Sequence, residues 1–413
     1  MKKNKIVSKL FAGAMAVALC LGTTNVALAA PGDETEDKKV AITKELDIAE
    51  GIQTPDVAFT FTFTQDTSSA DTTKTEVAIN PITLRFTSSD SQTDGMIVKE
   101  SKNILANVTF PNAGVYKYTV VETAGETTID NGNGEGTMKY DTTTYTMQIA
   151  VKNTDDGTVV DQVVVEKDGG EEGDESNKVE AAPTTDEETD SGNDDDANGS
   201  DSATGNGFRF VNAYTKNGGG IVDPVDPDPD QPDPDPTQSA LKITKTVVGD
   251  LADRNLGFSF NVNLEIPASS DVETVKGFIY NADGAYVSDA DFTNGDNAFT
   301  LAHGQYLTFK TLPAGTKYTV TESGTDNYTG ATSTVVGGGE AVVVNGEKSA
   351  TVSTAQSLVG EIAGNSTDVT NTYDDQSVTP TGIIVNNLPY VALILVAVIG
   401  CVAIVAGKKR RAN

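Results

Sequence analysis

One strand-like segment of this chain occurs twice, and the two glutamates that end the copies lie 200 residues apart: Pro111-Asn112-Ala113-Gly114-Val115-Tyr116-Lys117-Tyr118-Thr119-Val120-Val121-Glu122 and, shortened, Pro313-Ala314-Gly315-Thr316-Lys317-Tyr318-Thr319-Val320-Thr321-Glu322. Both copies alternate apolar and polar residues, which is typical of a strand with one buried face. An internal repeat of this kind predicts two related β-domains.

Two shorter motifs flank the repeated segment, and the first of them keeps nearly the same spacing in both copies. Ile42-Thr43-Lys44 and Ile243-Thr244-Lys245 precede the two copies, and Asn212-Ala213-Tyr214 and Asn371-Thr372-Tyr373 follow them. Other strand-like runs, such as 57–63 and 258–264, are short, and no long stretch has helical periodicity. The fold class that we expect is all-β, with two tandem immunoglobulin-like sandwiches.

Composition sets the expected boundaries of these domains. The first sandwich is predicted to cover 39–216 and the second 240–375, joined by an Asp/Pro-rich linker at 217–239. Alternating Asp and Pro favour extended polyproline II, so we expect two separate units on a semi-rigid tether. Residues 168–206 are rich in acids, Gly and Ser, and are predicted to be a disordered insertion in the first domain. Its Asp194-Asp195-Asp196 run lacks the EF-hand spacing and is interpreted as a solvated loop rather than a calcium site.

Each predicted domain places a lysine, a glutamate and an asparagine on an apolar face. Side chains two residues apart in a strand share a face, so Lys44 aligns with Ile42, Glu122 with Val120, and Asn212 with Phe210. The second domain repeats this pattern with Lys245, Glu322 and Asn371. The alternative is that these polar side chains lie at strand ends in water.

Burial of such a trio would allow amide exchange. Desolvation favours a neutral lysine, which is a nucleophile, and a protonated glutamic acid. The acid can polarise the asparagine carboxamide and pass a proton to departing ammonia. The product would be a Lys–Asn isopeptide bond, formed without an external enzyme because folding supplies proximity.

The two ends of the chain are predicted to be targeting signals. Residues 1–30 combine four lysines, an apolar run and Ala27-Leu28-Ala29, as in a secretory signal peptide; a lipoprotein signal ending at Cys20 is the alternative. Residues 376–413 hold Val378-Thr379-Pro380-Thr381-Gly382, an apolar span at 390–407 predicted to be a transmembrane helix, and a basic tail. This order resembles a Gram-positive sortase sorting signal, cleaved between Thr381 and Gly382; the alternative is a plain single-pass anchor.

Composition also excludes several classes of function. The net charge of −31 argues against nucleic-acid binding. The chain has one histidine, His303, and its two cysteines, Cys20 and Cys401, fall in the predicted end signals. We therefore expect no metal, no cofactor and no histidine-based catalytic triad. A secreted hydrolase has little support, and we expect a protein that is not an enzyme beyond cross-linking itself.

With these motifs, the chain from about residue 40 onward resembles the two-domain, streptococcal-type backbone pilins of Gram-positive bacteria. The Ile-Thr-Lys, Tyr-Thr-Val-x-Glu and Phe-x-Asn segments and Tyr140-Asp141-Thr142-Thr143-Thr144-Tyr145 carry the resemblance. It implies immunoglobulin-like domains in which Lys44 is bonded to Asn212 with Glu122 as catalyst. It likewise implies a Lys245–Asn371 bond with Glu322 as catalyst.

The resemblance also implies a structural function at the cell surface. A sortase would form an acyl-enzyme at Thr381, and a lysine of the next subunit would resolve it. The family position of that lysine corresponds to Lys178, which we prefer, or Lys167. The expected partners are a sortase, further copies of the chain and peptidoglycan, with a host or surface ligand as a candidate and the membrane only in the precursor. The alternative function is a monomeric wall-anchored adhesin.

Overall fold

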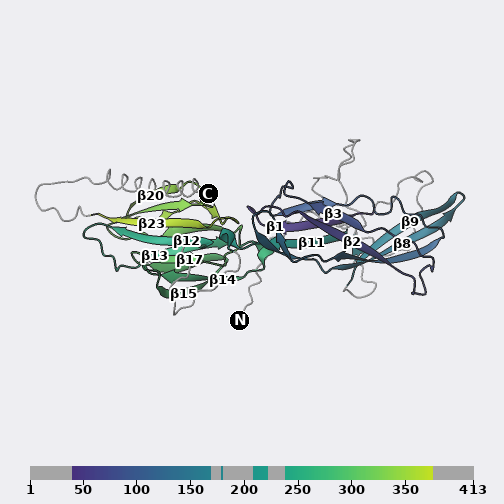
Figure 1. Cartoon of the computed structure of the whole chain (residues 1–413), viewed down its shortest axis with the longest axis horizontal. Helices are drawn as coiled ribbons and strands as arrows, with labels where there is room; N and C mark the ends of the chain where they lie inside the picture. The colour runs from purple at the N-terminus through teal and green to yellow at the C-terminus, as the bar shows by residue number, and fades with distance from the viewer. Residues whose placement is uncertain (1–39, 169–177, 180–207, 222–237, 375–413) are drawn as a thin grey trace, which may run out of the picture.

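The described strands of this chain form two successive sandwiches of facing β-sheets (Figure 1), and each sandwich has a core of buried apolar side chains. The computed structural model describes residues 40–168, 178–179, 208–221 and 238–374. These residues form strands and turns with two short 3-10 helices, η2 (Gly218–Gly220) and η3 (Ala268–Ser270). The prediction of an all-β chain with two tandem immunoglobulin-like sandwiches is confirmed.

The first sandwich pairs a five-stranded sheet with a six-stranded sheet. The five strands lie in the order β4-β1-β11-β7-β6 and the six in the order β10-β9-β8-β5-β2-β3. Their bounds are β1 (Ile42–Ile48), β2 (Val57–Asp66), β3 (Ile82–Phe86), β4 (Met96–Glu100), β5 (Gly114–Thr123), β6 (Thr128–Asp130), β7 (Glu135–Lys139), β8 (Thr144–Thr154), β9 (Gly157–Lys167), β10 (Lys178–Val179) and β11 (Phe208–Thr215).

The second sandwich pairs a seven-stranded sheet with a smaller one. The larger sheet has the order β15-β14-β17-β12-β23-β19-β20, and the smaller has the order β16-β13-β18-β21, with β22 also paired to β18. Their bounds are β12 (Leu241–Val248), β13 (Phe258–Glu265), β14 (Thr274–Tyr280), β15 (Tyr286–Thr293), β16 (Gly295–Leu301), β17 (Tyr306–Phe309), β18 (Lys317–Glu322), β19 (Tyr328–Val335), β20 (Val342–Lys348), β21 (Val352–Ser353), β22 (Ser357–Leu358) and β23 (Asn365–Tyr373).

The first and last strands of each sandwich are neighbours and run parallel. Strand β1 pairs with β11, and β12 pairs with β23, whereas the other strand pairs among the described residues are antiparallel. A parallel pair cannot be closed by a hairpin. Each pair therefore brings together segments from opposite ends of a domain.

The inward faces of the strands form two cores, one in each sandwich. The buried side chains follow the period of two that the sequence shows, as in β12, where Leu241, Ile243, Lys245 and Val247 are all buried. The first core includes Phe59, Phe61, Tyr118 and Phe210, and the second includes Phe260, Leu264, Tyr318 and Val320. Lysine and glutamate side chains thus lie inside otherwise apolar layers.

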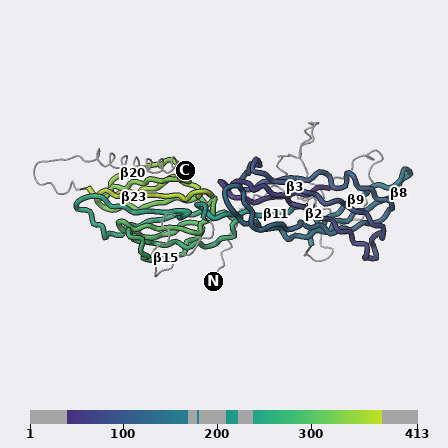
Figure 2. Tube along the Cα trace, in the orientation of Figure 1, coloured from purple at the N-terminus to yellow at the C-terminus, as the bar shows by residue number. Residues whose placement is uncertain are grey.

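The two sandwiches touch directly, end to end (Figure 2), so the expectation of separate units on a tether is wrong. Asn217 pairs with Pro313 of the second sandwich, and the N–H groups of Gly218 and Gly219 donate to the carbonyls of Leu312 and Gly360 at 2.8 Å. Residues 217–221 were expected to begin the linker, but they line the second domain. Amino-acid composition indicates whether the backbone of a segment is extended, but it does not indicate where the two ends of the segment lie in the fold.

The flanks of the Asp/Pro segment lie next to each other. A Cβ atom placed on Gly219 would be 2.8 Å from the carbonyl oxygen of Ser239, and Gly219 has a φ of 75°. The described residues on the two sides of the Asp/Pro segment therefore lie at one place in the fold.

Several predicted features fall outside the described residues. These are the signal peptide 1–30, the Asp/Pro residues 222–237, most of the acidic insertion, and the sorting signal with Thr381, Gly382 and the span 390–407. Within the insertion, Lys178 and Val179 differ from the expectation of disorder, because they pair with Glu166 and Val165 of β9. No helix within the described ranges is long and apolar enough to cross a bilayer.

The adjacent flanks generate a test of the linker. Deleting residues 226–233 should leave the sedimentation coefficient and the thermal unfolding midpoint unchanged, because the remaining residues still close the loop.

Gly219→Ala should destabilise the protein more than Gly337→Ala. Both glycines have positive φ, which costs about 1–2 kcal/mol for another residue, but nothing lies within 4 Å of a Cβ on Gly337. A more extended particle, or independent domain tumbling after the deletion, would contradict direct contact.

Candidate functional site

The first sandwich brings Lys44, Glu122 and Asn212 together between its sheets. The Nζ atom of Lys44 donates to Oε2 of Glu122 at 2.8 Å, and Nδ2 of Asn212 donates to Oε1 of the same carboxyl group at 2.6 Å. All three side chains are buried. Glu122 therefore bridges the lysine and the asparagine.

Strand register explains this meeting. In the parallel β1–β11 pair, Lys44 lies opposite Phe210 and Asn212 lies opposite Leu46. The asparagine is thus two residues further along the same face, diagonal to the lysine. Glu122 comes from β5 in the facing sheet, where it pairs with Phe61.

The second sandwich repeats this geometry. Nζ of Lys245 donates to Oε2 of Glu322 at 2.8 Å, and Nδ2 of Asn371 donates to Oε1 of Glu322. Lys245 lies opposite Val369 and Asn371 opposite Val247, which is the same two-residue offset in β12 and β23. The sequence-predicted trios are therefore assembled in both domains.

Burial shifts the protonation equilibria of both clusters. Desolvation lowers the pKa of Lys44 to about 8 and that of Lys245 to about 8, whereas it raises the pKa of Glu122 and of Glu322. The ion pair within each cluster opposes these shifts without cancelling them. A neutral amine next to a neutral carboxylic acid is therefore more accessible here than in water.

Aromatic rings supply much of the apolar surroundings. Nζ of Lys44 lies 4.6 Å from the ring centroid of Phe59, and Nζ of Lys245 lies 4.0 Å from that of Phe258. A ring face offers a lysine no lone pair to accept its protons. Each lysine thus has a glutamate as its polar partner, and desolvation by the surroundings favours the neutral amine although a ring face attracts the charged one.

The two clusters differ at the asparagine carbonyl. Oδ1 of Asn212 accepts a hydrogen bond from the backbone N–H of Asp141 at 2.7 Å. The carboxylate of Asp141 accepts from the N–H groups of Val211 and Thr143, each at 2.7 Å, and so fixes the loop between β7 and β8. Oδ1 of Asn371 is buried and has no hydrogen-bond partner among the described residues.

Sequence reasoning missed the part of Asp141 in this arrangement. The signal available was the order Asp141-x-Thr143, which is typical of a turn in which a side chain caps a backbone N–H two residues on. That pattern predicts a fixed turn, but it does not indicate which distant side chain the turn contacts.

The two candidate linking lysines lie at the edge of the six-stranded sheet. Lys167 ends β9 and is exposed, and Lys178 is exposed in the edge strand β10, where it pairs with Glu166. Both are accessible on one side of the first sandwich. Among the described ranges there is no group of His, Cys, Asp or Glu that could hold a metal.

Family models match both sandwiches. Residues 40–215 match the family described as Spy0128-like isopeptide containing domain. Residues 239–373 match a domain of unknown function, DUF7601.

Two curated proteins are similar in sequence to this chain. A pilin of Streptococcus pyogenes serotype M1 is 27% identical over 392 residues, which cover 90% of this chain and 91% of the relative. The resemblance to the Gram-positive backbone pilins is confirmed. The pilus tip adhesin Cpa of Streptococcus pyogenes is 31% identical over 108 residues, which cover 26% of this chain and only 15% of that protein.

Solved structures of pilins are also similar. The major pilin from Streptococcus pyogenes has 21% identity and a TM-score of 0.32, with 82% of this chain and 100% of that chain covered. The major pilin T3.2 of the same species has 20% identity and a TM-score of 0.30, with 82% and 99% covered. At these scores the superposition adds nothing to the description of the site.

The difference between the clusters predicts an order of reaction. Attack on an asparagine carboxamide places negative charge on Oδ1, and one preorganised donor to such an oxygen accelerates acyl transfer by about 100-fold or more. If both clusters react, the Lys44–Asn212 bond should form first. Intact mass measured during refolding, with peptide mapping, should show an intermediate that has lost one ammonia from the first domain.

A matched pair of variants checks this assignment. Asp141→Ala should slow the first bond without changing the second, because the loop that presents the backbone N–H loses its anchor. Asp155→Ala, at an exposed hairpin tip, should change neither. Equal rates in the two wild-type domains would contradict a role for the Asp141 N–H.

Proposed function

We propose that this protein is the backbone subunit of a covalently assembled pilus, and that each of its two sandwiches closes itself with a Lys–Asn isopeptide bond. The observation that carries the proposal is the buried Lys–Glu–Asn cluster, which occurs in both domains with the same register and the same bridging carboxyl group. Because burial of such groups is costly, their presence in both related domains in one geometry favours a shared chemical function.

The proposed reaction balances without an outside reagent. Lysine first passes a proton to the glutamate, and the neutral Nζ then attacks Cγ of the asparagine. The Nζ–Cγ bond forms and the Cγ–Nδ2 bond breaks, while the glutamic acid relays the proton released from Nζ to the departing Nδ2, which leaves as ammonia. The bond replaces a buried ion pair with a neutral amide, and the glutamate is left as the neutral acid that holds the proton it first took from the lysine.

Each bond would carry tension across a domain. The lysine is in the first strand and the asparagine in the last, so a pull along the chain passes through the bond and bypasses the strands between. Non-covalent stability of a domain is only about 5–15 kcal/mol, which sustained load can overcome. A cross-link at this position suits a surface fibre under shear.

The proposed route to the fibre uses the predicted end signals. After export with a signal peptide, the chain is held in the plasma membrane by residues 390–407. A sortase cleaves between Thr381 and Gly382 and transfers Thr381 to a lysine of the next subunit, with Lys178 preferred over Lys167. The finished polymer is attached to peptidoglycan in the cell wall.

A second candidate is a monomeric, wall-anchored adhesin with the same self-cross-linked domains. The match of part of this chain to a pilus tip adhesin favours it. The two candidates share the intramolecular bonds and differ in whether a ladder of covalent oligomers appears on the cell surface.

Intact mass tests the cross-links. Recombinant residues 31–376 should weigh less than the sequence mass by two ammonia molecules, because each domain loses one. Glu122→Ala and Glu322→Ala should each restore one, whereas Glu135→Ala, an exposed glutamate on β7, should restore none. Freshly folded wild-type protein of full mass would refute the proposal.

Surface extracts test the polymer. Wild-type cells should yield a ladder of high-mass species on denaturing gels, Lys178→Ala should abolish it, and Lys167→Ala should leave it intact. Loss of the ladder only in Lys167→Ala would assign that lysine instead. A wild-type extract without a ladder would favour the monomeric adhesin.

A further inference from the structure

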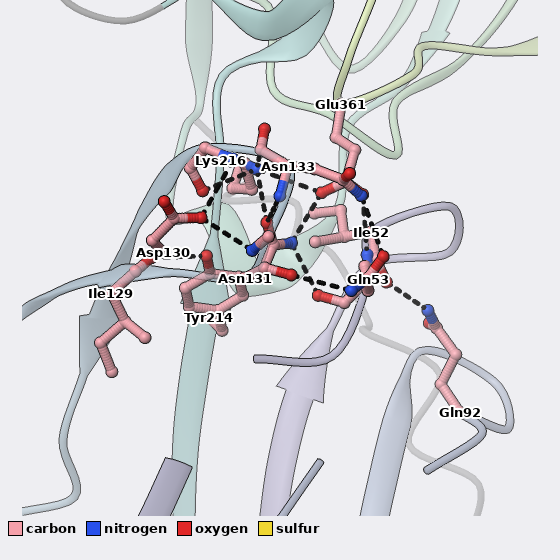
Figure 3. Close-up of polar contacts among 12 residues, drawn as sticks. Ile52, Gln53, Gln92, Ile129, Asp130, Asn131, Asn133, Tyr214, Lys216 and Glu361 are labelled. Carbon is pink, nitrogen blue, oxygen red and sulfur yellow. Dashed lines mark hydrogen bonds and ion pairs between the residues drawn. The ribbon is translucent and has the colours of Figure 1, made fainter. Parts of the chain in front are cut away.

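A third cluster of lysine, asparagine and glutamate lies between the two sandwiches (Figure 3). Glu361 reaches it from the second domain, from the loop between β22 and β23. Lys216 follows β11 and Asn131 follows β6, so both come from the first domain. Neither predicted site includes these residues.

The carboxylate of Glu361 is enclosed by donors of the first domain. Its Oε1 accepts from the backbone N–H of Gln53 at 3.1 Å and from Nδ2 of Asn133 at 2.6 Å. Its Oε2 accepts from Nδ2 of Asn131 at 2.8 Å and lies 3.3 Å from Nζ of Lys216. Glu361 is only 5% exposed, so the contact is desolvated.

The donors are held in place by bonds within the first domain. Nε2 of Gln53 donates to the carbonyl of Asn131, and Nδ2 of Asn131 donates to the carbonyl of Gln53, each at 2.8 Å. Nζ of Lys216 donates to Oδ1 of Asn131 at 2.9 Å and to the carbonyls of Asn133 and Gly134 at 3.0 Å. We call Gln53, Asn131, Asn133 and Lys216 the donor cage; its internal contacts do not involve the second domain.

The chain between the domains passes directly beside this cage. Gly219 donates to the carbonyl of Gly360, the residue before Glu361. A Cβ on Gly220 would lie 2.4 Å from the carbonyl oxygen of Ile362, the residue after it. The segment 218–220 therefore lies against the loop that carries the carboxylate and holds it toward the cage.

We propose that Glu361 and the donor cage form a non-covalent lock that docks the second sandwich on the first in one orientation. A buried carboxylate is tolerated only where hydrogen-bond donors surround it. The donor cage presents its donors to a carboxylate at one position, so only one orientation of the second domain satisfies Glu361. Rotation of the second domain about the junction would remove Glu361 from these donors.

The surroundings of Lys216 explain why this cluster stays non-covalent. Its ammonium group has a carboxylate and three carbonyl oxygens as acceptors, so its three protons are all engaged. Lys44 and Lys245 instead lie beside aromatic rings, with a single carboxylate partner each. The same residue types therefore form an ion lock here and reactive clusters there.

Cutting the chain between the domains tests the lock. A protease site would be placed within residues 222–237 of the folded protein and then cleaved. Sedimentation at decreasing concentration would measure whether the two halves stay associated. The wild-type halves should remain together. Glu361→Gln should weaken association by about 30-fold or more, as expected for loss of a buried hydrogen-bonded charge.

A matched control removes another carboxylate from the same interface. Glu50 of the first domain pairs with Lys317 of the second at 2.9 Å, but the two side chains are 65% and 40% exposed. Glu50→Gln should therefore weaken association less than about 5-fold. Asn133→Asp, which sets a second carboxylate against Glu361, provides a cage-side variant that should weaken association at least as much as Glu361→Gln.

Each outcome decides the proposal. Wild-type halves that separate, or equal effects of Glu361→Gln and Glu50→Gln, would overturn it. A third lost ammonia, mapped to Lys216 and Asn131, would replace the ion lock with a covalent bond. The two intradomain ammonia losses must persist in every variant to show that its domains are folded.

Discussion

Desolvation of a lysine and a glutamate between two sheets is the constraint on which each sandwich depends. An isolated buried charge costs several kcal/mol, and removing one partner of a buried pair costs about 3–5 kcal/mol. The first and last strands must therefore pair in the one register that sets Lys44 diagonal to Asn212, with Glu122 above them. A slip of one residue would turn the lysine to the outer face of the sheet.

The same constraint defines how force would pass through the molecule. Tension that enters at β1 would cross from Lys44 to Asn212 and leave along β11 toward Lys216. It would then cross the interface near Glu361, enter β12, and pass from Lys245 to Asn371 in β23. The domain junction is the one step on this path for which no side-chain cross-link is proposed, so the donor cage lies where the resistance to bending is set.

Sequence reasoning reached the strand content, the two sandwiches and the residues of both clusters, because these follow from local periodicity and an internal repeat. The alternation around Val120 and Val320 places Glu122 and Glu322 on the core face without any knowledge of the partner sheet. Asp141 and Glu361 could not be found in this way. Glu361 contacts Gln53 across 308 residues, and no short-range pattern encodes such a contact.

The Asp/Pro segment shows what amino-acid composition does not predict. Asp and Pro indicate an extended backbone. The prediction of two separated domains followed only if the residues on the two sides of this segment lie far apart. The close approach of Gly219 to Ser239 shows that they do not. The glycines at 218–220 are explained by steric contact with the second domain: a Cβ on Gly218 would lie 2.4 Å from Val359.

Three clusters contain the same residue types but differ in the surroundings of the lysine amine. Lysine, asparagine and glutamate meet at Lys44, at Lys245 and at Lys216, yet only the first two lysines have aromatic rings in place of carbonyl acceptors. Burial lowers the pKa of both of these lysines to about 8, which makes the neutral nucleophile accessible. Around Lys216 the backbone of the β6–β7 turn supplies the oxygen atoms that a charged amine needs. The solvation of each amine therefore favours the proposed cross-links at Lys44 and Lys245 and the proposed non-covalent contact at Lys216.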